Sequence, residues 1–355
     1  MIPIARPSIT EREVDAVARV VASGALAQGA EVAAFEAEFA DAVVGGRTTV
    51  AVSSGTAALH LLLLAHGLGP GDEVIVPSFT FAATANVVKL VGAEPVFADI
   101  DACFCLDPDA VAAALTPRTA AVIAVHLYGQ PADMSGLREV ARRGQVLLLE
   151  DAAQAHGAAL RGAPVGTLGD GAAFSFYPTK NMTTGEGGAV VLEDPDAVRT
   201  VRLLRNQGMD EQYEHEVVGF NLRMTEMSAA LGRVQLERFA ELTATRQGNA
   251  ARYDAALAGG PVQAPVVRDG ATHVYHQYTV RTGERDALAD RLHALGVQSR
   301  VYYPTPLHQQ LPFRGTAADL PETERATREV LSVPVGPHLA AADVECIADA
   351  LGATT

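Results

Sequence analysis

The chain has 355 residues, of which 48% are hydrophobic and 19% are charged, and its formal net charge is −15. This composition is typical of a globular protein, and the length suffices for about two domains. The acidic balance argues against broad binding to nucleic acid or to anionic membranes, because both attract basic surfaces.

The cysteines and the N-terminus indicate a cytoplasmic protein. Cys103, Cys105 and Cys346 lack the paired spacing of a zinc site, so we expect free thiols in a reducing compartment and no bound metal. The first residues, MIPIARPSIT, contain no basic segment followed by an apolar core, so no signal peptide is expected. The apolar run LHLLLLAHGLG is too short to span a bilayer and predicts a buried helix.

The predicted elements begin with one or two amphipathic helices within residues 10–40. From about residue 48 to residue 193, short β-branched runs alternate with helical stretches. Several of these runs are apolar almost throughout, as in strands that are covered on both faces. The order of elements predicts an α/β fold with a mostly parallel seven-stranded sheet flanked by helices. The expected strands are TTVAVSS, DEVIVPS, EPVFADI, AAVIAVHLYG, QVLLLEDAA, GAAFSFYP and GAVVLED.

The last third of the chain has a different pattern. A single long helix is expected over Met224–Gly260, and GGPVQAP follows it as a linker. The remaining chain predicts a small C-terminal α+β domain, built from the strand HVYHQYTVRT, the helix ERDALADRLHALG and the strand VQSRVYYP. We therefore divide the chain into a large domain at residues 1–245 and a small domain at residues 246–355.

Ligands of parallel sheets bind beyond the carboxyl ends of the strands, so the residues that follow each strand are candidates. SSGTAAL follows the first strand and opens a helix, where backbone N–H groups and the helix dipole attract anions. Gly55 permits close approach of a ligand and Thr56 adds a hydroxyl, although glycine at such a turn is often structural. In LLLEDAAQAHG an apolar strand runs straight into Glu150 and Asp151. A buried carboxylate needs a positive partner, unless Asp151 only caps a helix.

The stretch FSFYPTKNMTTGEGG carries the most informative residue, Lys180, just beyond a predicted strand. The chain contains only two lysines, Lys89 and Lys180, and lysine can lose its proton and attack a carbonyl carbon, whereas arginine cannot. Lys89 precedes apolar residues and a turn, so we interpret it as a surface lysine. Lys180, Asp151 and an anion-binding turn together match the needs of pyridoxal phosphate: a Schiff base, a partner for the ring nitrogen and a phosphate site.

These segments together resemble the DegT/DnrJ/EryC1/StrS family of pyridoxal phosphate-dependent sugar aminotransferases, which have fold type I. The resemblance covers essentially the whole chain and includes GPGDEVIVPSFTF, EPVFADID, HLYGQPADM, EDAAQAHGA and GFNLRMTEMSAALGRVQLERF. It implies that Lys180 forms the Schiff base and moves the proton, and that Asp151 pairs with the ring nitrogen. The other cofactor contacts that it implies are Gly55, Thr56 and Ser175 at the phosphate, Gln154 near the ring hydroxyl, Phe81 on the ring face, and Asn221, which reaches the cofactor of the neighbouring subunit in a homodimer with shared active sites.

The implied reaction transfers an amino group from L-glutamate to a 3- or 4-keto sugar linked to a nucleotide. The candidates for binding this substrate are Arg223, Tyr302, Tyr303 and His308, which offer positive charge or hydrogen bonds. A keto-cyclitol acceptor and a non-catalytic regulator that binds the cofactor are the alternatives. A sugar dehydratase is a further alternative, but the dehydratases of this family have histidine at the position of Lys180, so the lysine argues against that activity. His126 and His156 also follow strands, and each can face the substrate or lie in the core.

Overall fold

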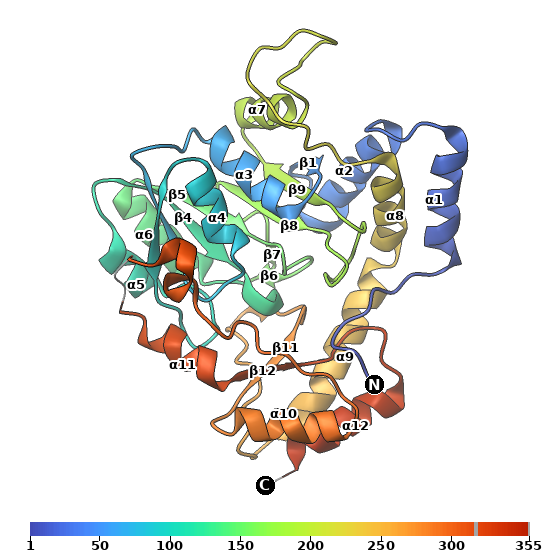
Figure 1. Cartoon of the computed structure of the whole chain (residues 1–355), viewed down its shortest axis with the longest axis vertical. Coiled ribbons are helices and arrows are strands. Elements are labelled where there is room, and N and C mark those ends of the chain that lie inside the picture. The colour runs from blue at the N-terminus through green and yellow to red at the C-terminus, as the bar shows by residue number, and fades with distance from the viewer. Residues whose placement is uncertain (316–318, 354–355) are drawn as a thin grey trace.

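The computed structural model describes residues 1–315 and 319–353. Its centre is a seven-stranded sheet with the order β1-β9-β8-β5-β4-β2-β3 (Figure 1). All seven expected strands are present, and β9 alone in this sheet runs antiparallel to its neighbours, so the predicted mostly parallel sheet is confirmed. The strands are β1 (Thr48–Val52), β2 (Glu73–Pro77), β3 (Glu94–Ala98), β4 (Thr119–Val125), β5 (Leu147–Asp151), β8 (Gly171–Ser175) and β9 (Gly188–Leu192).

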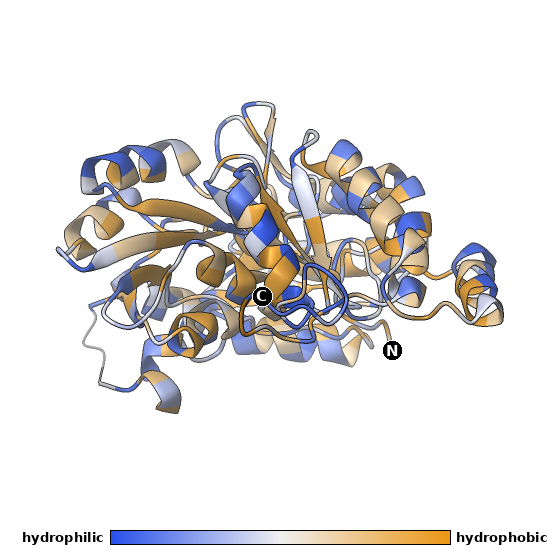
Figure 2. Ribbon diagram, turned by 90° about the horizontal axis from the view of Figure 1, so that it is seen from above, coloured by the Kyte–Doolittle hydropathy of each residue, from blue (hydrophilic) through white to orange (hydrophobic). Residues whose placement is uncertain are grey.

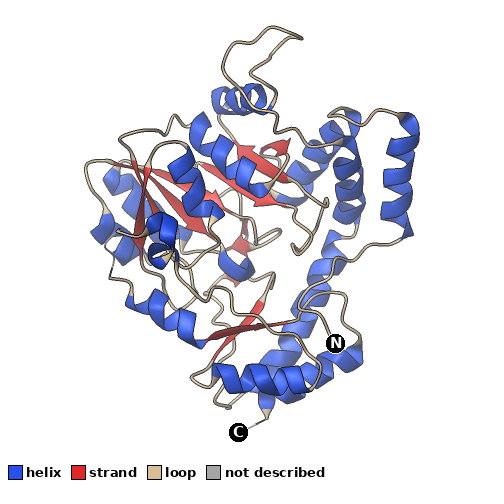
Figure 3. Ribbon diagram, viewed as in Figure 1, coloured by secondary structure: helices blue, strands red, loops and turns tan. Residues whose placement is uncertain are grey.

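Helices cover both faces of this sheet (Figure 3). The helices α3 (Gly55–Ala65), α4 (Ala83–Leu90) and α7 (Pro195–Arg205) share one core cluster with β1, β2 and β9. The other face is covered by α2 (Ala30–Val43), α5 (Pro108–Ala114) and α6 (Met134–Gly144). The run LHLLLLA lies in α3, and its leucines are mostly buried, as expected. Burial of one such side chain stabilises the fold by about 1.5–3 kcal/mol.

The strands of the central sheet are buried over most of their length. Figure 2 shows apolar runs along the central strands, whereas the outer helices alternate apolar and polar residues. On the α2 side of the sheet, the Phe39 ring centroid lies 5.2 Å from that of Phe174 and 5.3 Å from that of Phe176, in edge-on geometry. Such aromatic pairs add about 0.5–1.5 kcal/mol beyond burial. This packing fixes the strand ends from which the candidate site is built.

The helices outside the sheet differ in one respect from expectation. Two N-terminal helices form, α1 (Glu11–Ser23) and α2, but the single helix expected over Met224–Gly260 is wrong. The chain forms α8 (Glu226–Glu237) and α9 (Phe239–Leu257), with a break at Arg238 (φ −100°, ψ 1°). The Arg238 guanidinium donates to the Ser8 carbonyl (3.3 Å) and pairs with Glu13 (2.8 Å). Because α8 packs against α1 and α2 while α9 packs against the C-terminal α12 (Ala341–Gly352), tertiary contacts favour the break.

The C-terminal region is α+β, as expected, but its strands are placed differently. β11 (Tyr278–Arg281) pairs with β12 (Val330–Val333), and α10 (Arg285–Ala294), α11 (Pro321–Glu329) and α12 accompany them. The strand expected over residues 297–304 is wrong: within this segment Arg300 forms one isolated bridge, to Ser332, and Val297 another, to Ile2. The residues after Arg300 leave the sheet because they contact the large domain instead.

Short elements complete the described chain. They are β6 (Ala159–Leu160), β7 (Ala163–Pro164) and β10 (Ala271–Thr272), which form a three-stranded sheet, and the 3₁₀ turns η1 (Leu127–Gly129), η2 (Leu307–Gln309) and η3 (Leu311–Phe313). In Figure 1, α9 runs from the large part of the molecule into the small one. The domain bounds at residues 245 and 246 fall inside α9 and stay a prediction. Among the described residues, no helix is long and apolar enough to cross a lipid bilayer.

Candidate active site

The carboxyl ends of β1, β5 and β8 lie at one edge of the sheet, and the predicted site residues follow them. Asp151 ends β5 and lies opposite Ala173 of β8, while Ser175 ends β8. Lys180 comes five positions after Ser175, close enough to Asp151 for the two charges to influence each other. The sheet topology therefore brings the two predicted catalytic residues together.

Asp151 is a buried carboxylate with few partners. Its Oδ2 accepts a hydrogen bond from the Thr84 hydroxyl (2.8 Å), and its Oδ1 accepts one from the Ala153 N–H (3.2 Å). Burial raises the pKa of Asp151 above its ordinary value, although these hydrogen bonds and the charge of Lys180 act in the opposite direction. A buried carboxylate of this kind gains most from a cationic partner, such as a protonated ring nitrogen.

Lys180 lies in the turn after β8 and is partly buried. Desolvation lowers the pKa of its amine to about 8, and the neighbouring Asp151 charge opposes this shift. Within the described chain, no hydrogen bond or ion pair engages the Lys180 amine. An amine with this pKa is partly neutral near pH 7–8, as a nucleophile or a general base must be.

A cradle for an anion lies between β1, β8 and β9, at the N-terminus of α3. The Ser54 hydroxyl caps α3 by accepting from the Ala57 N–H (3.1 Å), and the helix begins with Gly55. A Cβ at Gly55 would lie 2.5 Å from the Ser175 Cβ, so only glycine fits there. The close packing of Gly55 against Ser175 sets the Ser175 hydroxyl beside the N-terminus of α3, and a hydroxyl next to the first N–H groups of a helix suits an anion such as a phosphate group.

Three further predicted residues adjoin this centre. The Gln154 side chain accepts from the Tyr128 N–H (2.8 Å) through Oε1 and donates to the Tyr303 hydroxyl (3.3 Å) through Nε2. The Tyr303 ring lies 6.4 Å from that of Phe81, whose side chain is exposed. Burial and the nearby charge of Asp151 both raise the pKa of the Tyr303 hydroxyl. Gln154, Tyr303 and Phe81 therefore form one wall of the site beside the Asp151 carboxylate.

The other substrate and cofactor candidates lie apart from this wall. His308 is held by the Ser78 hydroxyl (2.7 Å from Nδ1), and the Arg223 guanidinium donates to Asn206 (2.7 Å). Asn221 is exposed, and its side chain makes no hydrogen bond within the described residues. The carbonyl of Leu222 accepts from the Ser53 N–H (2.8 Å), so the Asn221 segment runs beside the anion cradle. The roles of His308, Arg223 and Asn221 stay predictions.

A comparison with protein families matches nearly the entire chain. The model of the DegT/DnrJ/EryC1/StrS aminotransferase family aligns with residues 7–352. The chain belongs to this family. It is a pyridoxal phosphate-dependent aminotransferase, which confirms the family, fold type, enzyme class and cofactor that the sequence motifs implied. The buried carboxylate, the lysine of lowered pKa and the glycine-lined cradle fit this cofactor.

Relatives and solved structures agree with this assignment. A dTDP-3-amino-3,4,6-trideoxy-alpha-D-glucose transaminase of Streptomyces venezuelae is 46% identical over 330 residues, which cover 91% of this chain and 87% of the relative. The GDP-perosamine synthase of Caulobacter vibrioides is 45% identical over 328 residues, which cover 89% of this chain and 88% of the relative. The crystal structure of DesV from S. venezuelae, in complex with a ketimine intermediate, has a TM-score of 0.93 at 44% identity, with 96% of this chain and 94% of that chain covered.

Both strand-end histidines of the aminotransferase are core residues. His126 donates through Nε2 to buried Glu150 (2.9 Å) and accepts from the Ala132 N–H (3.0 Å) through Nδ1. Glu150 also accepts from backbone N–H groups of residues 166, 168 and 169, so it fixes the turn before β8. His156 is fully buried, neither of its ring nitrogens meets a hydrogen-bond partner in the part of the chain that the structure describes, and burial lowers its pKa to about 3. Neither histidine faces solvent.

Sequence reasoning missed two residues of the candidate site and interpreted Lys89, outside it, correctly. Thr84, which holds Asp151, lies in the apolar helix α4, and Tyr128, which orients Gln154, lies in a short turn. Neither residue belongs to a pattern that indicates its contact. Lys89 is at the surface, ion-paired with Glu94, which confirms its interpretation as a surface lysine.

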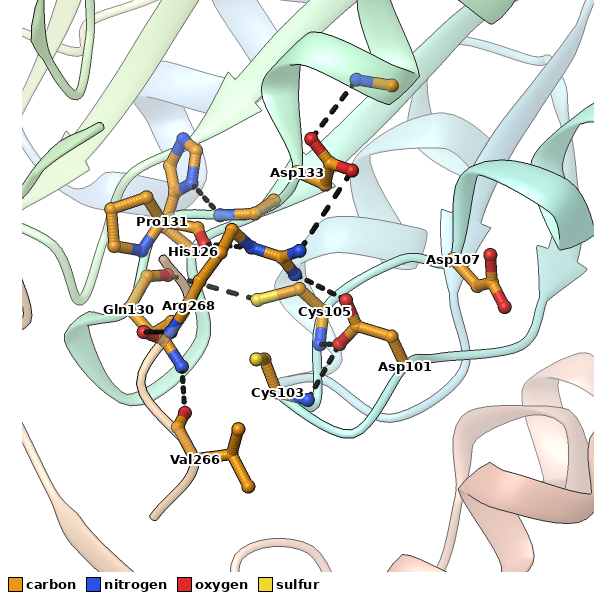
Figure 4. Close-up of polar contacts among 12 residues, drawn as sticks. Asp101, Cys103, Cys105, Asp107, His126, Gln130, Pro131, Asp133, Val266 and Arg268 are labelled. Atoms are coloured by element: carbon orange, nitrogen blue, oxygen red, sulfur yellow. Dashed lines mark hydrogen bonds and ion pairs between the residues drawn. The ribbon is translucent and has the colours of Figure 1, made fainter. Parts of the chain in front are cut away.

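The cysteine-containing loop holds two parts of the chain together (Figure 4). Asp101 accepts from the Cys103 N–H (2.8 Å) and forms an ion pair with Arg268, while the Cys105 thiol lies 3.8 Å from the Gln130 carbonyl. All three cysteines are free. Within the described residues, no group of histidine, cysteine and acidic side chains is arranged to hold a metal ion. The loop thus fastens the segment before β10 to the large domain.

Proposed function

We propose that this aminotransferase converts a nucleotide-linked keto sugar, with its ketone at C3 or C4, into an amino sugar, with L-glutamate as the amino donor. One observation carries the proposal: Lys180, Asp151 and the cradle of Gly55 and Ser175 lie at one edge of the sheet. Pyridoxal phosphate, when bound, supplies an aldehyde and a ring that accepts electrons. The names of the relatives, which specify dTDP- and GDP-linked sugars, support a nucleotide-linked acceptor.

Two residues would perform the chemistry. Lys180 would hold the cofactor aldehyde and, once released as a neutral amine, move a proton at the reacting carbon. Its lowered pKa supports this role, because a protonated amine can neither attack an aldehyde nor accept a proton. Asp151 would hold the proton on the ring nitrogen, since a buried carboxylate stabilises an adjacent cation.

The remaining cofactor contacts follow from the walls of the site. Gly55, Thr56 and Ser175 would bind the phosphate at the N-terminus of α3. Gln154 would hydrogen-bond near the ring hydroxyl, and Phe81 would cover one face of the ring. The exposed position of Phe81 beside Tyr303 supports its role, because an exposed aromatic ring next to a polar site is available for stacking.

The keto sugar would enter between the cofactor and the small domain. Tyr302 and Tyr303 are the best placed of the predicted substrate residues, since Tyr303 contacts Gln154 directly. We keep Arg223 and His308 as candidates for the diphosphate, because each offers a cationic or hydrogen-bonding group near a strand end.

We also propose a cytoplasmic homodimer with shared active sites. Asn221 is exposed beside the anion cradle, and the segment before it projects from the molecule at the top of Figure 1. This segment carries Tyr213 and Val218, with 81% and 92% of their surface exposed. Exposed apolar residues of this kind are typical of an interface. The free cysteines support a reducing compartment.

The absorption spectrum of the purified protein tests the reaction. The loaded enzyme should absorb at about 410–430 nm, and L-glutamate should move the band to about 330 nm, as cofactor chemistry dictates. Keto sugars linked to dTDP, UDP or GDP are then added one at a time, and the mass of each product is measured by mass spectrometry. A mass change for amination of one of these sugars is expected. Amination of a keto-cyclitol alone, or bleaching by other amino acids but not by glutamate, would contradict the proposal.

A further inference from the structure

Tyr128 joins two parts of the site that no sequence motif connects. It lies in η1, directly after β4, and its side chain is 3% exposed. Its backbone N–H donates to Oε1 of Gln154 (2.8 Å), and its hydroxyl donates to the backbone carbonyl of Tyr302. One residue therefore contacts both the side chain expected beside the cofactor ring and the segment expected to bind the substrate.

These contacts form a closed circuit of four residues. Tyr128 fixes which end of the Gln154 amide accepts, so Nε2 is left to donate to the Tyr303 hydroxyl (3.3 Å). Tyr303 follows Tyr302 in the chain, and the Tyr302 carbonyl accepts the hydrogen bond from the Tyr128 hydroxyl, which closes the ring of contacts. Since the Tyr303 oxygen accepts from Gln154, its own proton remains free to donate to a ligand.

The surroundings hold Tyr128 firmly in place. Its backbone is in the left-handed region (φ 60°, ψ 3°), which is costly for a bulky residue and persists only where neighbouring contacts enforce it. The Phe104 and Phe79 rings lie 5.6 and 6.4 Å away, edge-on, and the Gln277 N–H donates to the Tyr128 carbonyl (3.3 Å). Burial raises the pKa of the Tyr128 hydroxyl well above its ordinary value, so the hydroxyl remains a donor.

We infer that Tyr128 is a positioning residue that holds the Tyr302–Tyr303 segment against Gln154 and so sets the affinity for the sugar acceptor. Among the described residues, Lys180 and Asp151 make no hydrogen bond to Tyr128, and Tyr128 holds Gln154 through its backbone N–H, so removal of the hydroxyl alone should leave the reaction with the small amino donor unchanged. The kinetic part of this inference rests on the proposed function, whereas the physical link between Tyr128 and the segment does not.

The test compares two variants, each of which lacks one buried tyrosine hydroxyl. Tyr128→Phe keeps the ring and loses the hydrogen bond to Tyr302. Tyr253→Phe is the control, because the buried Tyr253 hydroxyl also donates to a backbone carbonyl, that of Pro334 (2.9 Å), within the small-domain core. Both variants lose a buried hydrogen bond from a tyrosine hydroxyl to a backbone carbonyl, so a general loss of stability should appear in both.

Hydrogen exchange is the first measurement and needs no substrate. Peptides that cover residues 302–309 contain the amides of Leu307 and His308, which donate to Ser78. These amides should exchange about fivefold faster in Tyr128→Phe, because a lost hydrogen bond worth about 1 kcal/mol corresponds to that factor. Their exchange rate should be unchanged in Tyr253→Phe. Equal exchange in Tyr128→Phe and the unsubstituted protein would overturn the positioning role, whether or not the enzyme transaminates sugars.

Kinetics are the second measurement and use the acceptor found by mass spectrometry. Tyr128→Phe should raise the KM for that acceptor about fivefold with little change in kcat, while the absorbance change with L-glutamate keeps its rate. Tyr253→Phe should alter neither. Equal slowing of the donor and acceptor reactions in Tyr128→Phe would show that the hydroxyl acts on the cofactor site as a whole, and the inference would be wrong.

Discussion

At Lys180 and Asp151, burial shifts the pKa values of the two groups toward each other. Desolvation lowers the pKa of Lys180 to about 8 and raises that of Asp151, because a low dielectric disfavours both charged forms. These shifts suit the two proposed roles: an amine that is available as a base, and a carboxylate that gains from a cationic ring. Perturbed groups of this kind mark functional sites.

The lowered pKa of Lys180 predicts how cofactor binding depends on pH. Only the neutral amine attacks an aldehyde, so the association rate with cofactor-free protein should rise through about pH 8 and then level off. About 1% of the amines are neutral at about pH 6 and about 90% at about pH 9. Rapid-mixing absorbance measures this rate. A rate that still rises tenfold between about pH 9 and about pH 10 would contradict the lowered pKa.

Thr84 should control the acid side of the activity profile. Thr84→Val removes the hydroxyl that stabilises the Asp151 carboxylate, so the pKa of Asp151 rises further. Activity that needs the carboxylate is present above this pKa and is lost as the pH falls through it. The acid limb of kcat/KM should therefore move upward by about 1 pH unit, and Thr84→Ser should restore it. An acid limb that stays in place would assign Thr84 to packing alone.

At the scale of elements, the sequence predicts those that depend on a local pattern, but not the features that depend on contacts between distant residues. The strands and their carboxyl ends could be predicted, and with them Lys180 and Asp151, because each strand is a local apolar run. The break at Arg238 involves no glycine or proline and depends on Ser8, 230 residues away. Residues 297–304 have the composition of a strand but are held by the large domain through Tyr302. Contacts of this kind leave no local signal.

The start of α3 should be intolerant of any side chain. Gly55→Ala places a Cβ 2.5 Å from that of Ser175, so the helix start must move and the affinity for pyridoxal phosphate should fall about tenfold or more. The control is Gly248→Ala in α9, where no atom of the described residues lies within 4 Å of the new Cβ. This control should raise the free energy of unfolding by about 0.5–1 kcal/mol. Unaltered cofactor titration in Gly55→Ala would rule out the cradle.

At the scale of the whole molecule, the exposed segment before Asn221 suggests that one chain does not complete the site. If active sites are shared, Lys180→Ala and Asn221→Ala chains should complement each other on co-expression. Random pairing makes about half of the dimers mixed, each with one intact site, so activity should reach about one quarter of that of the unsubstituted enzyme. Each variant expressed alone should be far less active. Failure of the mixture to regain activity would place Asn221 in its own chain's site.

The attachment of the cofactor is tested most directly by borohydride reduction of the loaded protein, followed by proteolysis and mass spectrometry. The chain has two lysines, and Lys89, ion-paired with Glu94 at the surface, serves as an internal control. We predict that the pyridoxyl group is found on Lys180 and not on Lys89. An unlabelled Lys180 peptide, or label on Lys89 alone, would contradict the assignment of Lys180 as the residue that holds the cofactor.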